Sequence, residues 1–223
     1  MKKRAPRKPA PKRAPLPQPH RRQDQILEAA FEVFAVKGFA AARLDDVAER
    51  AGVAKGTIYL YFRDKEQLFR AVVRSLIVKR IPFLEGDTDG SAPELLRGLL
   101  ARMYANIVRD AKVRAIVRML IAESGKFPQL ADIYHREIIS RGLRTVRTVL
   151  KMGIASGHFR RTQALRFPQI LVGPAVLAAI WGLVHGNRYH LNVEAYMRAH
   201  LELLMSALCR EGGGRAARAK RKR

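Results

Sequence analysis

The sequence predicts an all-α protein of about nine helices, with a small N-terminal helical domain and a larger C-terminal one. Apolar residues recur at spacings of three and four along most of the chain, as they do on the buried face of a helix. Val, Ile and Tyr clusters in strand-like alternation are absent. Glycines, prolines and helix-capping residues divide the apolar stretches into segments of helical length.

Charge is concentrated at the two ends of the chain. The 223 residues are 48% hydrophobic, which allows a proper core, and their formal net charge is +24. Met1–Arg22 holds nine Lys and Arg and Gly212–Arg223 holds six, and neither segment contains an acid. We therefore expect a disordered basic arm over 1–20 and a disordered basic tail over 212–223. The excess favours a polyanionic partner such as nucleic acid, although solvated tails alone give weak support.

Several classes of protein are disfavoured. Cys209 is the single cysteine, which excludes an internal disulfide and a Cys-rich zinc site and suits a reducing cytosol. The N-terminus lacks the apolar run of a secretory signal, and Ile170–Val184 is too short to span a bilayer. No catalytic constellation, phosphate-binding glycine motif or paired metal-ligating histidines are present. We expect a cytoplasmic protein without membrane partner, enzymatic activity, metal or cofactor.

The first domain is expected over residues 21–81. Gly38 follows the apolar stripe of the first helix as a stop signal, and Gly52 lies where a tight turn between two short helices needs a positive φ. Asp64 and Gln67 have the spacing of a capping box at the start of a longer helix. The expected helices are Asp24–Lys37, Leu44–Ala51, Lys55–Tyr61 and one that begins at Asp64.

The two short helices form a helix-turn-helix. Neither is long enough to be stable alone, so both must pack on the helices that flank them. Ala48 is small, which allows the second helix to cross the first closely. This arrangement leaves one side of Lys55–Tyr61 free to enter a DNA major groove. The expected core residues are Phe31, Phe34, Val47, Ala51, Val53, Ile58, Phe62, Leu68 and Phe69.

The exposed side of this recognition helix carries groups suited to DNA. Lys55 can neutralise a phosphate, and Gly56 lets the backbone approach closely. Thr57, Tyr59 and Tyr61 can donate hydrogen bonds to phosphates or touch thymine methyl groups. The alternatives are that Lys55 is a solvated charge and that Tyr61 packs partly in the core.

The run from Gln25 to Phe69 closely resembles the N-terminal domain of the tetracycline-repressor (TetR) family. The resemblance implies a cytoplasmic homodimer that binds a palindromic operator and is released by a small ligand. It also implies a phosphate contact at Lys65, where a helix N-terminus attracts anions. The matching pieces are Ile-Leu-Glu-Ala-Ala-Phe (26–31), Phe-Ala-Val-Lys-Gly-Phe (34–39), Val-Ala-Glu-Arg-Ala-Gly-Val (47–53), Lys-Gly-Thr-Ile-Tyr (55–59), Tyr-Phe (61–62) and Asp-Lys-Glu-Gln-Leu (64–68).

Three positions depart from the family pattern. The family usually has Thr-Ser or Thr-Thr where Ala42 and Arg43 stand, which removes a helix cap but offers Arg43 as an extra phosphate contact. Ala54 occupies a position that is often Ser, so the recognition helix also loses its usual cap. Leu60 replaces a residue that is frequently polar, and it reaches either a thymine methyl group or no base at all.

The second domain is expected over residues 82–211. Ser91 and Glu94 repeat the capping-box spacing at its start. In the TetR family the last two helices form a four-helix interface with those of the mate, which implies a homodimer through Pro168–Arg210. The expected helices are Pro93–Arg109, Lys112–Ser124, Pro128–Ser156, Pro168–Gly186 and Asn192–Arg210.

Met and aromatic residues with a few polar groups suggest a site in this domain for an amphipathic small-molecule effector. For any single one of them, a plain helical core is the better explanation. Glu123 needs a partner, either an arginine of the protein or a cationic ligand. Trp181 and His185 share a helix face, where His185 is better explained as an interface histidine. The candidate residues are Met103, Tyr104, Ile107, Met119, Glu123, Phe127, Tyr134, Trp181 and His185.

These observations predict a ligand-released repressor that acts as a homodimer on double-stranded DNA. The first alternative is a non-switching architectural DNA binder, in which the C-terminal half serves only to dimerise. The second is an enzyme or carrier with incidental affinity for DNA, which the missing catalytic constellation disfavours.

Overall fold

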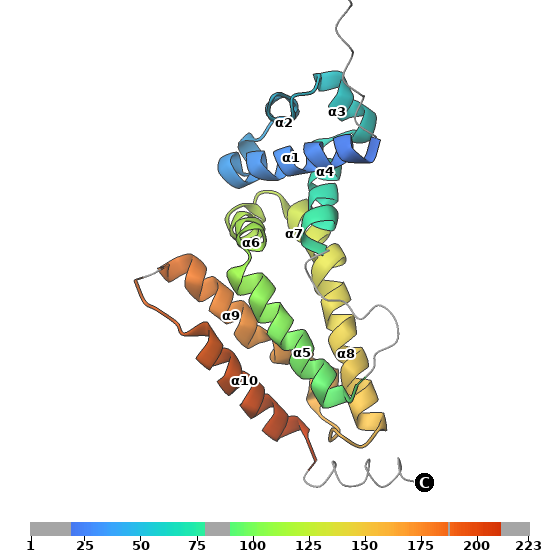
Figure 1. Cartoon of the computed structure of the whole chain (residues 1–223), viewed down its shortest axis with the longest axis vertical. Coiled ribbons are helices and arrows are strands. Elements are labelled where there is room, and N and C mark those ends of the chain that lie inside the picture. Colours follow the sequence, from blue (N-terminus) through green and yellow to red (C-terminus); the bar gives the residue numbers. More distant parts are fainter. Residues whose placement is uncertain (1–18, 79–89, 187, 211–223) are drawn as a thin grey trace, which may run out of the picture.

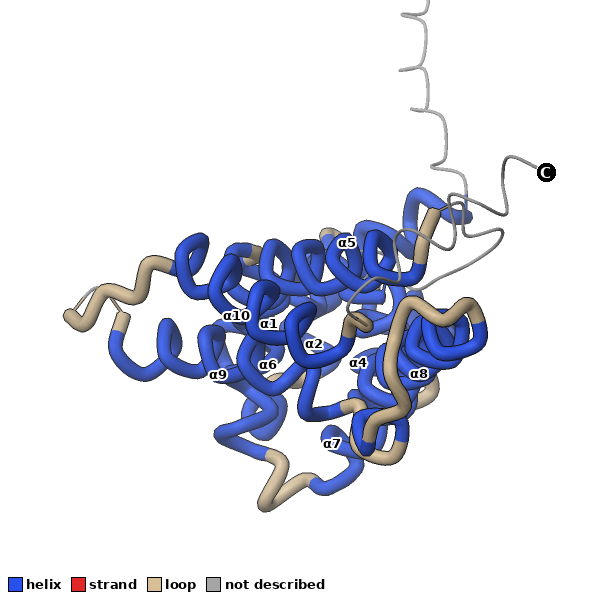
Figure 2. The backbone as a smooth tube through the Cα atoms, turned by 90° about the horizontal axis from the view of Figure 1, so that it is seen from below, coloured by secondary structure: helices blue, strands red, loops and turns tan. Residues whose placement is uncertain are grey.

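The computed structural model describes residues 19–78, 90–186 and 188–210. Figure 1 shows this part of the chain as helices, with a small group at one end of a longer bundle. Seen from below in Figure 2, the same residues form helices and loops without a strand. The predicted tail, and all of the predicted arm but its last two residues, lie outside the described residues.

The N-terminal group contains four α-helices. Gly38 has φ 74° and ψ 172° and breaks the first helix where the sequence predicts a stop, and Gly52 has φ 64°, so both glycine predictions are confirmed. The first helix begins five residues before the predicted Asp24. The helices are α1 (Pro19–Ala41), α2 (Leu44–Ala51), α3 (Lys55–Tyr61) and α4 (Lys65–Val72), and α4 continues as the π-helical segment η1 (Val73–Ile77).

The C-terminal bundle contains the remaining helices. The helix predicted at Pro128–Ser156 is one helical stretch without a gap, in which a π-helical segment lies between two α-helices. Counted in this way, the described residues form nine continuous helical stretches, apart from one short 3-10 turn. The elements are α5 (Ala92–Tyr104), η3 (Ala105–Arg109), α6 (Ala111–Glu123), α7 (Pro128–Tyr134), η4 (His135–Ile139), α8 (Ser140–Ala155), η5 (Gln163–Leu165), α9 (Gln169–His185) and α10 (Val193–Leu208).

The helix starts follow the predicted caps with one difference. The Asp64 carboxylate accepts a hydrogen bond from the Gln67 amide at 2.7 Å. Ala54 offers no side-chain cap to α3. The expectation that α2 is uncapped is wrong in part, because Asp46 accepts a hydrogen bond from the Arg43 amide at 3.0 Å. Half of a capping box therefore survives without the hydroxyl residue.

One hydrophobic cluster runs from α1–α4 into α6 and α7 without a break. The predicted small core belongs to it, although Ala51 and Val53 are only partly buried. Phe39 joins its two parts, since its ring lies 5.8 Å from that of Phe69 and 5.4 Å from that of Phe127. A second cluster joins α5, α8, α9 and α10. Within the described ranges, no helix has both the length and the apolar character needed to cross a membrane.

Tyr104 and His200 form a polar pair between α5 and α10. The Tyr104 side chain is buried, and its hydroxyl lies 3.0 Å from His200 Nδ1. Burial raises the pKa of Tyr104 to about 12 and lowers the pKa of His200 from its ordinary value of 6.5. Protonation of His200 therefore favours the unfolded chain.

We expect the free energy of unfolding to fall as the pH drops through 6.5, because the unfolded histidine takes up a proton before the folded one does. His200→Gln removes this titration but keeps a group that can bond to Tyr104. Urea unfolding of both proteins at pH 7.5 and pH 5.5 measures the effect. The loss of stability on acidification should be smaller in the variant, and an equal loss would show that His200 does not contribute.

Candidate nucleic-acid interface

The recognition helix α3 presents one buried and one exposed side. Ile58 is fully buried and anchors α3 in the core shared with α1, α2 and α4. The next two side chains point away from this core, since Tyr59 is 48% and Leu60 84% exposed. Figure 1 places α2 and α3 at the end of the molecule farthest from α10. Among the residues that the structure describes, no other helix covers Leu60 on the exposed side of α3.

The other predicted DNA contacts differ in how exposed their side chains are and in whether they already have partners in the protein. Gly56 and Arg43 are exposed, and Thr57 is half-buried. The Lys55 ammonium forms an ion pair with Asp45 at 2.7 Å, and this hydrogen-bonded partner raises the pKa of Lys55. Tyr61 packs against the core, with its ring 6.2 Å from that of Phe62. The expectation that Tyr61 packs partly in the core is therefore confirmed. Contact of any of these residues with DNA stays a prediction.

Lys65 differs from the rest because its ammonium points inward. It donates hydrogen bonds to the carbonyl oxygens of Phe39 at 2.6 Å, of Ala40 at 3.1 Å and of Ala42 at 3.1 Å. An ammonium has three hydrogens, so these bonds use all of them. Desolvation lowers the pKa of Lys65, against the opposing effect of the nearby Glu123 carboxylate. A phosphate contact at Lys65 stays a prediction, and it would have to replace at least one of these bonds.

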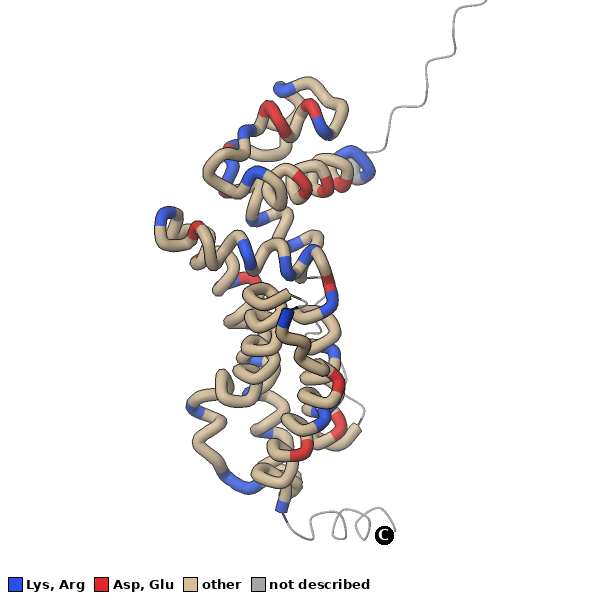
Figure 3. The backbone as a smooth tube through the Cα atoms, turned by 90° about the vertical axis from the view of Figure 1, so that its left-hand side faces the viewer, with Lys and Arg blue, Asp and Glu red and all other residues tan. Residues whose placement is uncertain are grey.

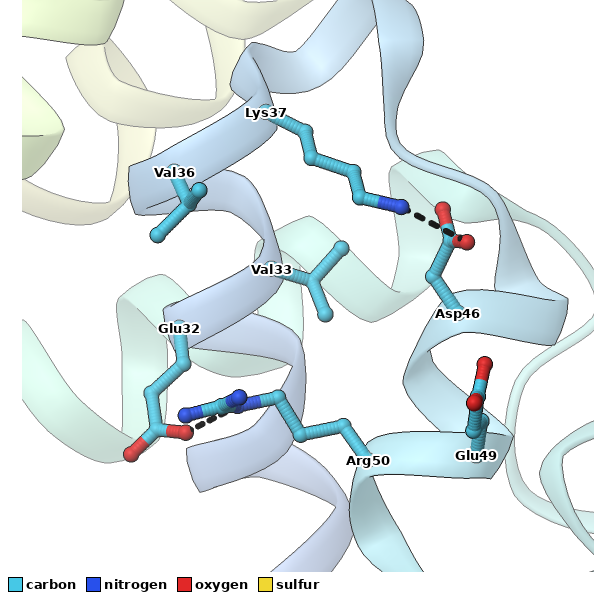
Figure 4. Close-up of a pocket in the computed structure, with 7 residues that line it drawn as sticks. All are labelled: Glu32, Val33, Val36, Lys37, Asp46, Glu49 and Arg50. Atoms are coloured by element: carbon cyan, nitrogen blue, oxygen red, sulfur yellow. Dashed lines mark hydrogen bonds and ion pairs between the residues drawn. The ribbon is translucent and has the colours of Figure 1, made fainter.

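Ion pairs hold α2 against α1 across a shallow groove (Figure 4). Lys37 pairs with Asp46 at 2.8 Å, and Arg50 pairs with Glu32. The groove has a volume of about 450 Å³ and a mostly charged lining. It therefore does not match the apolar site expected for an amphipathic effector. Neither ion pair was predicted from the sequence. Asp46 alone left a signal there, because an acid three residues after Arg43 can accept a hydrogen bond from the Arg43 amide.

The structure does not bring the nine candidate effector residues together. Met119 is buried in the cluster that contains the helix-turn-helix, and Ile107, Phe127 and Tyr134 pack against it. Tyr104 is the centre of a separate small cluster with α9 and α10. Of the remaining four, Met103 packs against two clusters in the bundle, Trp181 and His185 have rings 4.4 Å apart on α9, and Glu123 ends α6. Effector contact by these residues stays a prediction.

Glu123 has a different partner from the two that the sequence suggests. Its carboxylate accepts hydrogen bonds from the backbone amides of Phe39 at 2.9 Å and Ala40 at 2.7 Å. Neither an arginine nor a cationic ligand is needed to satisfy it. This residue joins the C-terminal bundle to the turn between α1 and α2.

Both domains of the chain carry a basic excess. Residues 21–81 contain 12 basic and eight acidic side chains, and residues 82–211 contain 18 basic and 11 acidic ones. Figure 3 shows blue and red interleaved in the upper part of the molecule. In the described part of the chain, no group of three or more His, Cys, Asp and Glu side chains is placed to hold a metal ion.

Comparison with known families matches both halves of the chain. The family model of bacterial regulatory proteins of the tetR family matches residues 26–72. The model of the C-terminal domain of AefR-like transcriptional repressors matches residues 94–166.

Individual proteins are similar over most of the chain. The fatty acid metabolism regulator protein of Bacillus subtilis strain 168 is 27% identical over 187 residues, which are 82% of this chain and 94% of the relative. The transcriptional repressor KstR2 of Mycolicibacterium smegmatis is 29% identical over 149 residues, or 64% and 70% of the two chains. The crystal structure of Bacillus subtilis FadR in complex with stearoyl-CoA has a TM-score of 0.64 at 24% identity, covering 82% of this chain and 98% of that one. This last likeness supports the predicted all-α fold.

Proposed function

We propose that this chain acts as a homodimeric repressor that a small molecule releases from DNA. The chain belongs to the TetR family of bacterial regulatory proteins and is a DNA-binding transcriptional regulator of that type. The proteins that it resembles are transcriptional regulators, not enzymes. Under this proposal, each protomer places α3 in one of two successive major grooves of a palindromic operator. The reading head comprises residues 21–81, and residues 82–211 bind the effector and dimerise.

The exposed side of α3 is the observation that carries the DNA-reading role. Tyr59 and Leu60 are large and adjacent, and they are exposed although most large apolar side chains of α1–α4 are buried. Base reading requires side chains of this kind at the groove-facing surface. The DNA contacts that we propose are Arg43, Lys55, Gly56, Thr57, Tyr59, Leu60 and the outer edge of Tyr61.

Tyr59→Ala tests this assignment. An operator is first selected from random double-stranded DNA with the natural chain, and binding of the variant is then measured by fluorescence anisotropy. We expect a loss of roughly 10- to 100-fold in operator affinity, because a base contact contributes about 1–3 kcal/mol. Affinity for unrelated DNA, which depends on phosphate contacts, should stay nearly the same. Unchanged operator binding would place the reading surface elsewhere.

The proposed homodimer uses the outer face of α9. This helix carries no Asp, Glu, Lys or Arg, and its inner face is buried through Leu171, Ala175 and Ala178. The opposite side of α9 presents an apolar face that the described residues leave largely exposed, with the Trp181 indole donating to the Tyr189 carbonyl, and a second copy is the partner that we propose for this face. Its exposed residues are Ile170, Val176, Leu177, Ile180, Trp181 and Val184.

The proposed effector is an anionic amphiphile. The basic excess of residues 82–211, with 18 Lys and Arg against 11 Asp and Glu, favours an anionic head group, and the Met and aromatic side chains of the bundle suit an acyl chain. A relative regulates fatty acid metabolism, and a neighbouring structure holds stearoyl-CoA. Stearoyl-CoA is therefore the first probe.

Titration of stearoyl-CoA into the protein–operator complex, followed by anisotropy, tests the switch. Coupling of about 1–3 kcal/mol would weaken operator binding roughly 5- to 150-fold at saturation. Coenzyme A alone and stearate alone are the matched controls for the head group and the chain. Binding of the probe without any change in operator affinity would instead favour the architectural dimer.

A further inference from the structure

Residues 38–42 comprise the end of α1 after its break at Gly38 and the first residue of the link to α2, and they are called the turn between α1 and α2 here. Gly38 leaves the helical region with φ 74°, so the backbone groups that follow it need other partners. The ring of Phe39 is buried next to Phe34, Phe69 and Phe127, which holds the turn within the core. Because α2 begins two residues later, the position of this turn fixes the position of the helix-turn-helix.

Two charged side chains bond to polar backbone groups of the turn. Glu123 ends α6 and accepts the amides of Phe39 and Ala40 through separate carboxylate oxygens, at 2.9 Å and 2.7 Å. Lys65 begins α4 and donates to three carbonyl oxygens of the same turn, with its ammonium also 4.5 Å from the centre of the Phe39 ring. Hydrogen bonds with a charged partner are about twice as strong as neutral ones.

We propose that Glu123 and Lys65 form a clamp on residues 38–42 that positions α2 and α3 for operator binding. Both are then positioning residues, and Lys65 acts through its bonds to the carbonyl oxygens of the turn and not as a phosphate contact. Glu123 belongs to the C-terminal bundle, so the clamp fixes the reading head to α6. This inference rests on the proposed DNA-reading role of α3.

The first experiment compares Glu123→Gln and Lys65→Met with the natural chain on a selected operator, over a series of salt concentrations. An amide at 123 can accept from only one of the two backbone N–H groups and presents a donor to the other. We expect each variant to bind roughly tenfold more weakly, as for the loss of one hydrogen bond to a charged group. The dependence of log affinity on log salt should keep its slope in Lys65→Met. If Lys65 instead contacted a phosphate, the slope would fall by about 0.9 for each phosphate lost, and the clamp would be overturned.

Glu28→Gln is the matched control for stability. Glu28 pairs with Lys112 and so also joins α1 to α6, but it lies away from the turn. We expect operator binding of Glu28→Gln to stay close to that of the natural chain. An equal loss in Glu28→Gln and Glu123→Gln would mean that any weakening of the α1–α6 contact lowers DNA binding, which contradicts a specific clamp. The double variant Glu123→Gln/Lys65→Met should lose less than the product of the single losses, because both residues hold one turn.

A pair of glycine variants tests the same point without removing a charge. Gly38 and Gly52 have similar positive φ values of 74° and 64°. A Cβ at Gly38 would overlap Glu123 Oε1, whereas a Cβ at Gly52 meets nothing within 4 Å. Gly38→Ala should therefore weaken operator binding more than Gly52→Ala, which carries the backbone strain alone. Equal effects of the two variants would count against the clamp.

Hydrogen exchange separates failure of the clamp from failure of the proposed function. Exchange at the Phe39 and Ala40 amides needs no DNA, and we expect it to be at least tenfold faster in Glu123→Gln than in the natural chain or in Glu28→Gln. Unchanged exchange would overturn the clamp even if the operator assays succeed. Failure of the natural chain to select any operator, with faster exchange in the variant, would overturn the DNA-reading role alone.

Discussion

Leu177→Glu is expected to convert the protein from a dimer into a monomer and to lower operator affinity by roughly 100-fold or more. Leu177 is 54% exposed near the middle of α9, on the face for which we propose a second copy. In a twofold interface the same patch faces itself, so each substitution brings two carboxylates into one apolar contact. Burying an unpaired charge is strongly unfavourable, and dissociation avoids it.

Sedimentation equilibrium measures the oligomeric state, and anisotropy measures operator binding on the same samples. Ile121→Glu is the matched control, because Ile121 is a 63% exposed apolar residue on α6 and not on α9. The control should remain a dimer. Retention of the dimer in Leu177→Glu would show that α9 is not at the interface, and loss of the dimer without loss of operator affinity would show that one reading head is enough.

Local features of the chain were sufficient to predict the helices and the small core. The break at Gly38 and the positive φ of Gly52 are confirmed because a helix stop and a tight turn leave a recognisable signature in sequence. The burial of Ile58 and Phe69 is confirmed for a similar reason, since apolar residues at helical spacing must face inward. These features depend on neighbours within one or two turns.

Contacts across long stretches of sequence were not predictable. Glu123 was recognised as an acid in need of a partner, but its partners are backbone amides more than 80 residues away, and an amide has no sequence signature. The inward position of Lys65 depends on the turn that Gly38 opens in α1. A lysine at a helix N-terminus therefore looks the same in sequence whether it contacts a phosphate or carbonyl oxygens of its own chain.

The candidate effector residues show the same limit. Met, Tyr and Phe at helical spacing identify an inner face, but they do not determine which helices meet there. Tyr104 packs against α9 and α10, whereas Phe127 packs against Phe39 in the N-terminal group. The packing of the helices therefore places Met and aromatic side chains of the same kind in different clusters.

The second large effect concerns the ion pair between Arg74 in η1 and Glu137 in η4, with 2.8 Å between nitrogen and oxygen. The Glu137 side chain is only 11% exposed, whereas that of Arg74 is 62% exposed. Arg74→Met leaves a nearly buried carboxylate without its partner. Fully buried pairs lose about 3–5 kcal/mol when one member is removed. Because the Arg74 side chain remains mostly solvated, we expect a smaller loss of roughly 2 kcal/mol in the free energy of unfolding.

Urea unfolding at pH 7 measures this loss, and two further variants identify its cause. Arg198 and Glu194 form a pair that is exposed on both sides, at 66% and 59%, so Arg198→Met should change stability by less than about 0.5 kcal/mol. Arg74→Met/Glu137→Leu removes the unpaired charge as well, and it should recover most of the stability lost in the single variant. If the double variant were less stable than Arg74→Met, the cause would be lost packing at the junction of η1 and η4, and not the buried carboxylate.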